Sequence, residues 1–329
     1  MEGTSGNVRD VSEPDTVVVP FDELPLLPSA GLRHSWHVHG PGDQLGTLNR
    51  LTGAVVAAAA ATVRGGERIG LNLPLGLPDP SFFGRQAPKH TLFPMFAGAW
   101  DDRLDGFYLQ ASSQWDGFRH ISAGADGFYG GWRGSPDTDL EPLGMHHWAR
   151  RGIVGRGVLI DLAAAAGSGY DPADPVRFGP ADLEAALREQ RTSLRYGDIL
   201  CIRTGWMDTY LALDEPARRE LASRLTDPFG YTCAGLAGSE EMSRFLWDTG
   251  IAAVTCDNPA VETVPVDPSI GSLHQRLIPC LGFAIGELFD FAALAAACRR
   301  ERRFEFLFVA VPLNLTGAVG SPANAVAIL

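Results

Sequence analysis

The sequence predicts an α/β fold, and two observations support this prediction. Short apolar runs bounded by Gly, Asp or Pro recur after residue 150, and such runs are typical of buried strands. Segments with helical periodicity lie between these runs, and the alternation of strands with helices indicates an α/β architecture. The 329 residues are 45% hydrophobic and 20% charged, which is an ordinary composition for a globular protein with a sizeable core.

The individual elements are placed from these patterns. Strands are expected at residues 157–162, 199–204, 251–256 and 306–312. Helices are expected at residues 53–64, 181–191, 240–249 and 291–300. Thr52, Ser239 and Asp290 can cap three of these helices, because a side-chain oxygen at that position accepts a hydrogen bond from a free backbone N–H group of the first turn.

Charge and hydropathy exclude several classes of partner. Acidic residues exceed basic ones by 39 to 27, which gives a formal net charge of −12. This excess argues against nucleic acid or an anionic membrane, since both require basic patches. The longest apolar run, at residues 54–63, is also too short for a bilayer crossing, which needs roughly 20 residues. We therefore expect a soluble protein.

The first residues of the chain and the cysteines indicate the compartment. The first 15 residues mix charges with Gly and Ser and hold no apolar core, so they do not read as a secretory signal. The five cysteines are widely spaced and include no CxxC pair, which argues against a disulfide framework or a thiolate zinc site. A cytoplasmic protein with reduced thiols is expected.

Composition also divides the chain into two parts. Residues 1–30 are polar and punctuated by Pro, and we expect them to form a flexible N-terminal arm that reaches a neighbouring subunit. Residues 31–329 are expected to form one α/β domain, although this length lies near the upper limit of roughly 250–300 residues for a single core.

One polar segment stands out within an aromatic-rich stretch. Residues 110–120 place Gln110, Gln114, Asp116 and His120 at spacings of four, two and four. Even spacings put side chains on one face of an extended segment. Burying such polar groups without partners costs about 1–3 kcal/mol each. A bound cation would satisfy several of them at once; alternatively, they pair with one another on the polar face of a strand.

This segment resembles the signature of the cyclase superfamily of metal-dependent hydrolases, which includes bacterial kynurenine formamidase and isatin hydrolase. The signature reads H-x-G-T-H-x-D-x-P-x-H. Asp116 matches its metal-bridging aspartate, and His120 matches its catalytic histidine. Gln110 and Gln114 stand in place of two metal-binding histidines. The SQWDG…H form at residues 113–120 is similar to a longer branch, which trans-dienelactone hydrolase, a zinc-dependent enzyme, also resembles.

The resemblance continues through most of the chain from about residue 40. Matching motifs occur in order at residues 42–49, 151–159, 197–206, 257–259 and 320–324. His274 and Glu287 fall where the family places its remaining histidine and glutamate ligands. The resemblance implies the cyclase fold, a swivelling β/β/α-type domain with a mixed central sheet flanked by helices, and it implies a homo-oligomer, most simply a homodimer.

The same resemblance implies a metal site. Its ligands would be Gln110, Gln114, Asp116, His274 and Glu287. The two carboxylates balance the charge of one divalent cation, with neutral amide and imidazole groups completing the shell. Amide oxygens in place of imidazoles favour Mn²⁺, Mg²⁺ or Ca²⁺ more than a His-rich site does, whereas the resemblance implies zinc. We expect one divalent ion, zinc or manganese, which would activate water and polarise a substrate carbonyl.

Their positions in the sequence give expected roles to His120, to Asp257 and to the aromatic residues near the motif. By the resemblance, His120 acts as general base and then acid. Asp257 follows a predicted strand, where α/β sites often gather, and would orient His274 or bind substrate, although an Asx turn explains it equally well. Aromatic residues near the motif would line an apolar pocket for a small cyclic carbonyl substrate, although some of them are expected in the core. These are Trp115, Phe118, Phe128, Tyr129 and Trp132.

Three functions are compatible with these observations. The favoured one is a metal-dependent hydrolase that opens a lactone or a cyclic amide, as in secondary metabolism. The second is a biosynthetic cyclase or dehydratase that acts on a polyketide-like or terpenoid intermediate. The third is a metal-free binding protein that kept the fold after losing two imidazoles. Metal content separates the third from the other two.

Overall fold

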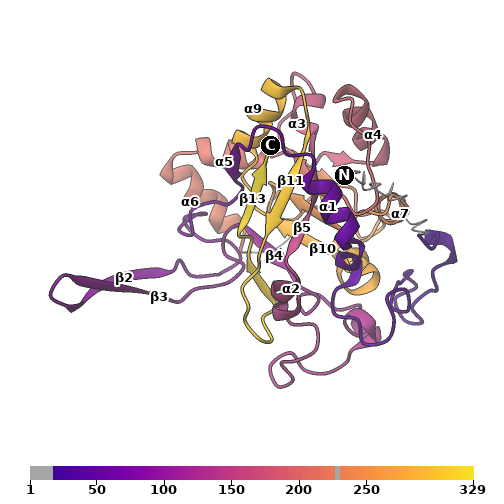
Figure 1. Ribbon diagram of the computed structural model, residues 1–329, viewed down its shortest axis with the longest axis horizontal. Helices are drawn as coiled ribbons and strands as arrows, with labels where there is room; N and C mark the ends of the chain where they lie inside the picture. The colour runs from indigo at the N-terminus through magenta and orange to yellow at the C-terminus, as the bar shows by residue number, and fades with distance from the viewer. Residues whose placement is uncertain (1–17, 227–229) are drawn as a thin grey trace, which may run out of the picture.

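A nine-stranded sheet forms the centre of the molecule in the computed structural model, which describes residues 18–226 and 230–329 (Figure 1). In chain order its strands are β1 (Arg68–Gly70), β4 (Gln114–Asp116), β5 (Ile153–Asp161), β7 (Ile199–Arg203), β9 (Ala253–Cys256), β10 (Ala284–Glu287), β11 (Glu305–Ala310), β12 (Gly320–Pro322) and β13 (Ala325–Ile328). Across the sheet they follow the order β1-β13-β11-β5-β7-β9-β10-β4-β12.

The middle of this sheet is parallel and both flanks are antiparallel. β5, β7, β9 and β10 run parallel to one another. β4 pairs antiparallel with β10 and β12, while β11 pairs antiparallel with β5 and β13. The predicted α/β fold with a mixed sheet is thus confirmed. The four predicted strands are β5, β7, β9 and β11, and β7 and β9 are almost entirely buried, as expected for apolar runs in a parallel sheet.

The described helices are α1 (Gly53–Ala60), α2 (Met145–Arg151), α3 (Leu162–Ala165), α4 (Pro180–Glu189), α5 (Trp206–Ala212), α6 (Glu215–Arg224), α7 (Glu240–Asp248), α8 (Leu273–Gln275) and α9 (Ala292–Glu301). The four predicted helices correspond to α1, α4, α7 and α9. Thr52 and Ser239 cap α1 and α7 by accepting backbone N–H groups, and Asp290 accepts the first N–H of α9. Only α1 is clearly shorter than predicted, because the chain leaves the helix after Ala60.

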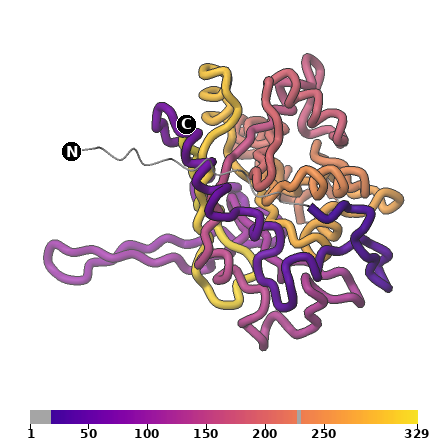
Figure 2. The backbone as a smooth tube through the Cα atoms, turned by 45° about the vertical axis from the view of Figure 1, so that its right-hand side comes forward, coloured from indigo at the N-terminus to yellow at the C-terminus, as the bar shows by residue number. Residues whose placement is uncertain are grey.

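Helices flank the sheet on both sides, with α4 and α7 to the right and α5 and α6 to the left in Figure 1. Two small sheets lie outside the main one. β6 (Arg177–Phe178) and β8 (Gly235–Leu236) form a short parallel pair. β2 (Lys89–Phe96) and β3 (Ala99–Asp105) form an antiparallel hairpin that projects from the body (Figures 1 and 2).

The described part of the predicted N-terminal arm lies against the domain. Phe21, Leu24 and Leu27 are buried, and the backbone N–H of Phe21 donates to Asp248 Oδ1 at 2.8 Å. Residues 18–30 are therefore anchored by apolar side chains that the polar composition of the segment concealed. Residues 1–17 of the predicted arm lie outside the described residues.

Two other expectations concern the thiols and the membrane. All five cysteines are buried and carry free thiols. Among the described residues, none of the helices has the length and apolar character that a bilayer crossing demands.

Candidate metal and catalytic site

Strands β4 and β10 bring three predicted site residues together. The two strands pair antiparallel, and Gln114 lies directly opposite Glu287. Gln114 Nε2 donates to Glu287 Oε2 at 2.7 Å. Asp116 lies two residues beyond Gln114, and side chains two apart on a strand point to the same face. The backbone register thus places both carboxylates and the Gln114 amide on one side of the sheet.

His274, on the short helix α8, completes this cluster. Its Nε2 lies 2.9 Å from Glu287 Oε1 and 3.8 Å from Asp116 Oδ2. One ligand atom from each of these three residues lies within 4.8 Å of the other two. A divalent ion with ligands at about 2.0–2.2 Å fits between atoms at such separations.

Gln110 and His120 approach the cluster from the two turns around β4. Gln110 Nε2 donates to Asp116 Oδ1, and it lies 3.2 Å from His120 Nδ1. His120 Nε2 is 3.9 Å from Asp116 Oδ2. Only Gln114–Asp116 is extended, so turns rather than one continuous strand bring the four polar side chains of residues 110–120 together.

Two oxygens of the cluster test whether a cation fits. Gln114 Oε1 and Asp116 Oδ2 accept no hydrogen bond from any residue that the structure describes, and their side chains are 2% and 0% exposed. A buried acceptor without a donor costs about 1–3 kcal/mol, and a cation would remove that cost. Together with His274 Nε2 and Glu287 Oε1, these oxygens form a mixed nitrogen and oxygen set that suits a divalent ion.

Gln110 differs from the other four expected ligands. Its amide nitrogen faces Asp116 Oδ1 and the His120 ring, so the side chain bridges the carboxylate and the histidine. The residues that fit a metal are therefore Gln114, Asp116, His274 and Glu287, with Gln110 holding Asp116 in place.

The titratable groups of the cluster have pKa values that are shifted in different directions. Burial by itself raises the pKa of Asp116, but His120, His274 and the Gln110 hydrogen bond lower it to about 2. Burial and the charge of Asp116 raise the pKa of Glu287 to about 7. Asp116 tends to raise the pKa of His120, but burial and the nearby charges of His274 and Arg85 outweigh it and lower that pKa. His120 is thus kept neutral beside an ionised aspartate.

Glu262 is a site residue that sequence reasoning missed. Its Oε1 lies 2.8 Å from His274 Nδ1 and accepts the His274 backbone N–H at 3.1 Å. Its Oε2 accepts the Leu273 N–H at 2.6 Å. A carboxylate on Nδ1 fixes the ring orientation and leaves Nε2 toward Asp116 and Glu287. The available signal was the only charged residue in the mostly apolar residues 258–266.

Arg85 is the second missed neighbour. Its guanidinium donates to the backbone carbonyl of Gln110. Burial lowers the pKa of Arg85, and the negative charges of Asp116 and Glu287 oppose that lowering. It therefore offsets part of the negative charge of the cluster and fixes the turn that carries Gln110. Its position before the hairpin gave no sequence signal for this role.

Asp257 is not part of the cluster. Its Oδ1 accepts the N–H and the hydroxyl of Thr204, both at 2.7 Å, and its Oδ2 accepts the Gly205 N–H at 2.8 Å. These contacts hold the turn that precedes α5. The orienting contact on His274 that was expected of Asp257 is made by Glu262, because residues after β9 turn Asp257 toward the end of β7.

Three of the five predicted pocket aromatics belong to the core. Trp115 alternates with Gln114 and Asp116, so it points to the opposite face of β4, where its ring packs 5.6 Å from Phe289. Phe118 packs 4.6 Å from Tyr129. All three predicted residues are at most 1% exposed, so they cannot contact a substrate in this structure.

Phe128 and Trp132 remain partly exposed, and their rings lie 5.5 Å apart. Arg119 covers Trp132 at 5.1 Å. Substrate contact by this pair stays a prediction. Burial, together with the charges of Cys233, Glu287 and Glu262, raises the pKa of another aromatic residue, Tyr231.

A second group of possible ligands lies at Glu141, His146 and His147. Its hydrogen bonds argue against a metal. The Gly317 N–H donates to His146 Nδ1 at 3.4 Å, which leaves the ring proton on Nε2. His147 Nε2 donates to the Glu141 carbonyl at 2.9 Å. Both nitrogens that face Glu141 therefore carry protons, and they offer no lone pair to a cation. His146 is buried and its Nε2 has no hydrogen-bond partner among the described residues, while Glu141 is exposed.

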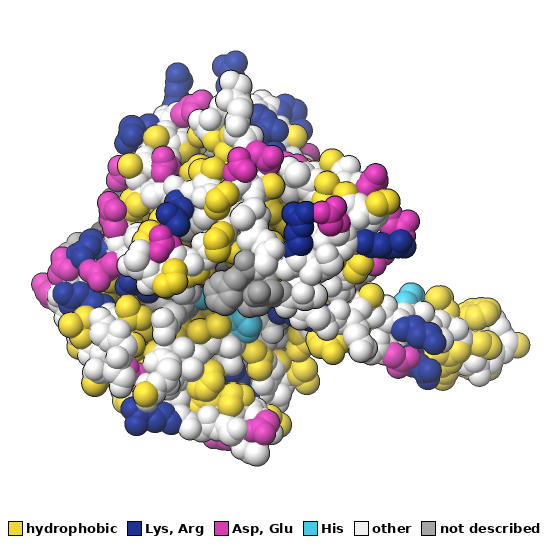
Figure 3. Space-filling model, turned by 180° about the vertical axis from the view of Figure 1, so that it is seen from behind, with side chains coloured by type: hydrophobic (Ala, Val, Ile, Leu, Met, Phe, Trp, Pro, Cys, Tyr) yellow, Lys and Arg dark blue, Asp and Glu magenta, His cyan; other side chains and the backbone are white. Residues whose placement is uncertain are grey.

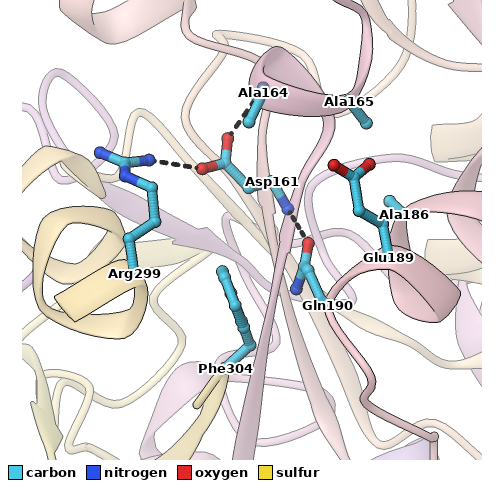
Figure 4. A pocket seen from close by; sticks show the side chains of 8 residues that line it. All are labelled: Asp161, Ala164, Ala165, Ala186, Glu189, Gln190, Arg299 and Phe304. Atoms are coloured by element: carbon cyan, nitrogen blue, oxygen red, sulfur yellow. Dashed lines mark hydrogen bonds and ion pairs between the residues drawn. The ribbon is translucent and has the colours of Figure 1, made fainter. Parts of the chain in front are cut away.

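A separate cavity of about 210 Å³ lies between α3, α4 and α9 (Figure 4). Asp161 points into it, but its carboxylate is already bound by Ala164 N–H, Arg203 and Arg299. None of the residues of the metal cluster lines this cavity. It therefore has no part in the chemistry proposed below.

Comparison with known proteins identifies the family. The model of the family described as "Putative cyclase" matches residues 72–263. The chain belongs to this cyclase family. A solved structure described as a novel cyclase is 30% identical, with a TM-score of 0.77, over 90% of this chain and 99% of that chain. The predicted cyclase resemblance is thus confirmed.

Two more distant structures share the fold of this cyclase-family chain. Isatin hydrolase A from Labrenzia aggregata, solved with benzyl benzoate, is 15% identical with a TM-score of 0.55, over 86% of this chain and 99% of its own. Isatin hydrolase A from Ralstonia solanacearum is 14% identical with a TM-score of 0.54, over 84% and 96%. A search of curated proteins gave no match to the sequence.

Proposed function

We propose that this cyclase-family chain is a metal-dependent hydrolase that opens a lactone or a cyclic amide. The observation that carries the proposal is the convergence of Asp116, His274 and Glu287 beside His120, with two buried oxygens that have no donor among the described residues. Membership in a family with isatin hydrolase among its structural neighbours supports a hydrolytic reaction on a cyclic carbonyl compound.

The side chains divide the work of such a reaction. Gln114, Asp116, His274 and Glu287 would hold one divalent cation, zinc or manganese, which polarises a carbonyl and lowers the pKa of water when bound. The His120 side chain is 26% exposed, so its ring can meet a substrate that enters from solvent. As a neutral base it accepts the proton of the attacking water and returns it to the leaving oxygen or nitrogen.

Gln110 and Glu262 position the groups that act. Gln110 Nε2 lies between Asp116 Oδ1 and His120 Nδ1, so it keeps the base beside the carboxylate. Glu262 holds the His274 ring from behind. This arrangement fixes the reacting groups before substrate arrives, which is the general requirement for acid–base catalysis by a side chain.

The test combines metal analysis with hydrolysis. The purified protein should contain about one equivalent of zinc or manganese per chain, and it should hydrolyse members of a panel of lactones and cyclic amides. In H₂¹⁸O, the opened product should carry one labelled oxygen. Turnover without label would instead support a cyclase or dehydratase. Less than about a tenth of an equivalent of metal, with no effect of chelator, would support a metal-free binding protein.

The variant His120→Ala tests the proposed base. Removal of a general base is expected to lower kcat by about 10²–10⁴-fold while metal content stays unchanged, because His120 is not among the fitting ligands. His37→Ala is the matched control, since His37 is an exposed histidine outside the cluster. Full turnover by His120→Ala would refute the role.

A further inference from the structure

A cavity of about 200 Å³ lies between strand β5 and the segments that follow α4 and α9. Five of the 27 basic residues of this acidic chain line it. They are Arg156, Arg191, Arg195, Arg302 and Arg303. Figure 3 shows Lys and Arg side chains gathered at the top of the molecule, the end where Figure 1 shows α4 and α9. None of the metal-cluster residues lines this arginine cavity, so it is separate from the proposed hydrolytic site.

Arg156 forms the fixed and neutralised part of the arginine cavity. Its side chain is only 6% exposed. Its Nη1 donates to Asp198 Oδ2 at 3.0 Å, and its Nη2 donates to the Ser193 carbonyl at 3.0 Å. Glu305 Oε2 lies 2.6 Å from the same Nη2. The two carboxylates beside the cavity therefore serve Arg156. Five positive charges against two negative ones leave a surplus of three.

That surplus is carried by guanidinium groups that are free to meet a ligand. Arg191 and Arg302 are exposed, and neither guanidinium has a hydrogen-bond or ion-pair partner among the described residues. The side chain of Arg195 is 58% exposed, and its Nη2 is 4.0 Å from Glu305 Oε2, beyond hydrogen-bond distance. An anion that entered the cavity would therefore find N–H donors that are not already bound to the protein.

Two of these arginines stand where backbone geometry favours glycine. Arg191 and Arg302 follow the last turns of α4 and α9 with φ values of 53° and 51°. Residues with a Cβ atom rarely adopt this left-handed region, and Gly is the usual residue at such a helix end. A cation there also interacts with the helix dipole, but a residue in the last turn would do so without the unfavourable φ. The geometry carries both guanidinium groups to the rim of one cavity.

The arginine cavity adjoins the cavity of about 210 Å³ between α3, α4 and α9 (Figure 4), because Gln190 and Phe304 line both. Gln190 is held in place, since its Oε1 accepts the Asp161 N–H at 2.8 Å and its Nε2 donates to the Leu159 carbonyl. The carboxylates of Asp161 and Glu189 disfavour an anionic group in this second cavity. Three small apolar side chains line the rest of it: Ala164, Ala165 and Ala186.

We propose that the two cavities together bind a small phosphate monoester, with the phosphate group among the arginines and the organic part against the alanines. A phosphate dianion suits the surplus of three positive charges, and its oxygens accept the paired N–H groups of guanidinium forks. Ligand pockets usually measure about 300–1,000 Å³, so either cavity alone is small and the pair reaches that range. Nucleic acid is disfavoured because the whole chain carries a charge of −12.

Calorimetric titration of the purified protein with phenyl phosphate, inorganic phosphate and benzoate tests both parts of the site. Phenyl phosphate should bind about tenfold more tightly than either of the others, because only it combines a dianion with a ring that leaves water. Ala165→Leu fills the apolar cavity, so it should weaken phenyl phosphate about tenfold and leave inorganic phosphate unchanged. No binding of phenyl phosphate at millimolar concentration, or equal affinity for phenyl phosphate and benzoate, would overturn the proposal.

The double variant Arg191→Gly/Arg302→Gly tests the arginines without straining the backbone. Since Gly suits both positions, the melting temperature without ligand should not fall. Affinity for inorganic phosphate should drop about 100-fold through the loss of two charge-assisted contacts. Arg224→Ser is the matched control, because it removes an exposed arginine from α6 and should leave the affinity unchanged. Wild-type affinity in the double variant would contradict the assignment.

A further variant separates this site from the metal cluster, since phosphate can also bind a divalent ion. Asp116→Asn alters the cluster and should leave the affinity for phenyl phosphate unchanged. Loss of binding in Asp116→Asn, together with normal binding in Arg191→Gly/Arg302→Gly, would place the phosphate on the metal and overturn the proposal.

Discussion

At the scale of single residues, the chemistry of the site depends on which buried groups already have partners. Asp257 and Asp116 are both fully buried aspartates, yet their surroundings differ. Asp257 has a donor for each oxygen, whereas Asp116 Oδ2 has none among the described residues. Only the surroundings of Asp116 favour a bound cation, because a carboxylate whose oxygens already accept hydrogen bonds gains little from one.

Glu262→Gln should weaken metal binding by about 10–100-fold, the usual effect of losing a carboxylate behind a ligating histidine. The reason is that the amide no longer holds His274 Nδ1 as a negatively charged acceptor. Titration of the metal-free protein with Zn²⁺ or Mn²⁺ measures the dissociation constant. Asp257→Asn should leave this constant unchanged in the folded protein, although it lowers stability. Equal effects of the two variants would contradict the assignment of Glu262.

Metal binding should release about one proton near pH 7. His274 Nε2 and Glu287 Oε1 lie 2.9 Å apart, within hydrogen-bond distance. Burial opposes the charged form of His274, but the surrounding carboxylates raise its pKa well above the ordinary value. Because the metal needs the unprotonated nitrogen, affinity should rise with pH until that proton is lost. Calorimetry in two buffers with different ionisation enthalpies counts the proton; equal heats would contradict the prediction.

At the scale of elements, the three-residue strand β4 carries the site between β10 and β12. Its neighbours must leave room for the side chains around it. A Cβ atom on Gly320 of β12 would lie 2.5 Å from Gln110 Cγ and 2.8 Å from the Trp115 carbonyl oxygen. Since the second contact is backbone, an added methyl group cannot be accommodated by a side-chain rotation alone.

Gly320→Ala should therefore move Gln110 away from Asp116 and His120. Overpacking of this kind usually costs about 1–3 kcal/mol of stability, and turnover should fall while the metal ligands remain present. Gly70→Ala in β1 is the matched control, because an added Cβ there meets nothing within 4 Å. Chemical denaturation and kcat measure the two effects, and normal values for both in Gly320→Ala would refute the packing argument.

At the scale of the whole molecule, the cluster joins parts of the chain that are far apart. Asp116, His274 and Glu287 come from β4, α8 and β10, so a cation that binds them stabilises the folded state and not the unfolded chain. The hairpin also begins shortly after Arg85 and ends shortly before Gln110, and these two residues are hydrogen-bonded to each other.

Removal of the metal should lower the melting temperature. At a free metal concentration of 100 times the dissociation constant, linkage contributes about 2.7 kcal/mol, which corresponds to roughly 4 °C for a chain of this size. Differential scanning fluorimetry with and without EDTA, followed by restoration with Zn²⁺ or Mn²⁺, measures the shift. Asp116→Asn should abolish it, and an unchanged melting temperature of the wild type on EDTA treatment would contradict the prediction.

The sequence by itself determined the alternation of strands and helices, the caps at Thr52 and Ser239, and the family. These features depend on local periodicity, on hydrogen bonds within one turn, or on ordered motifs. The sequence also predicted that Gln114 and Asp116 lie on the same face of a strand. Residues two apart on one strand share a face whatever the rest of the fold does.

Only the tertiary structure decided which side chains meet. Glu262 reaches His274 across a loop, Asp257 turns toward Thr204, and Trp115 faces the core rather than a pocket. The same aromatic pattern is compatible with a core or with a pocket, since composition does not show which face of a strand is covered. Burial and hydrogen-bond partners depend on contacts between distant segments, and those exist only once the chain has folded.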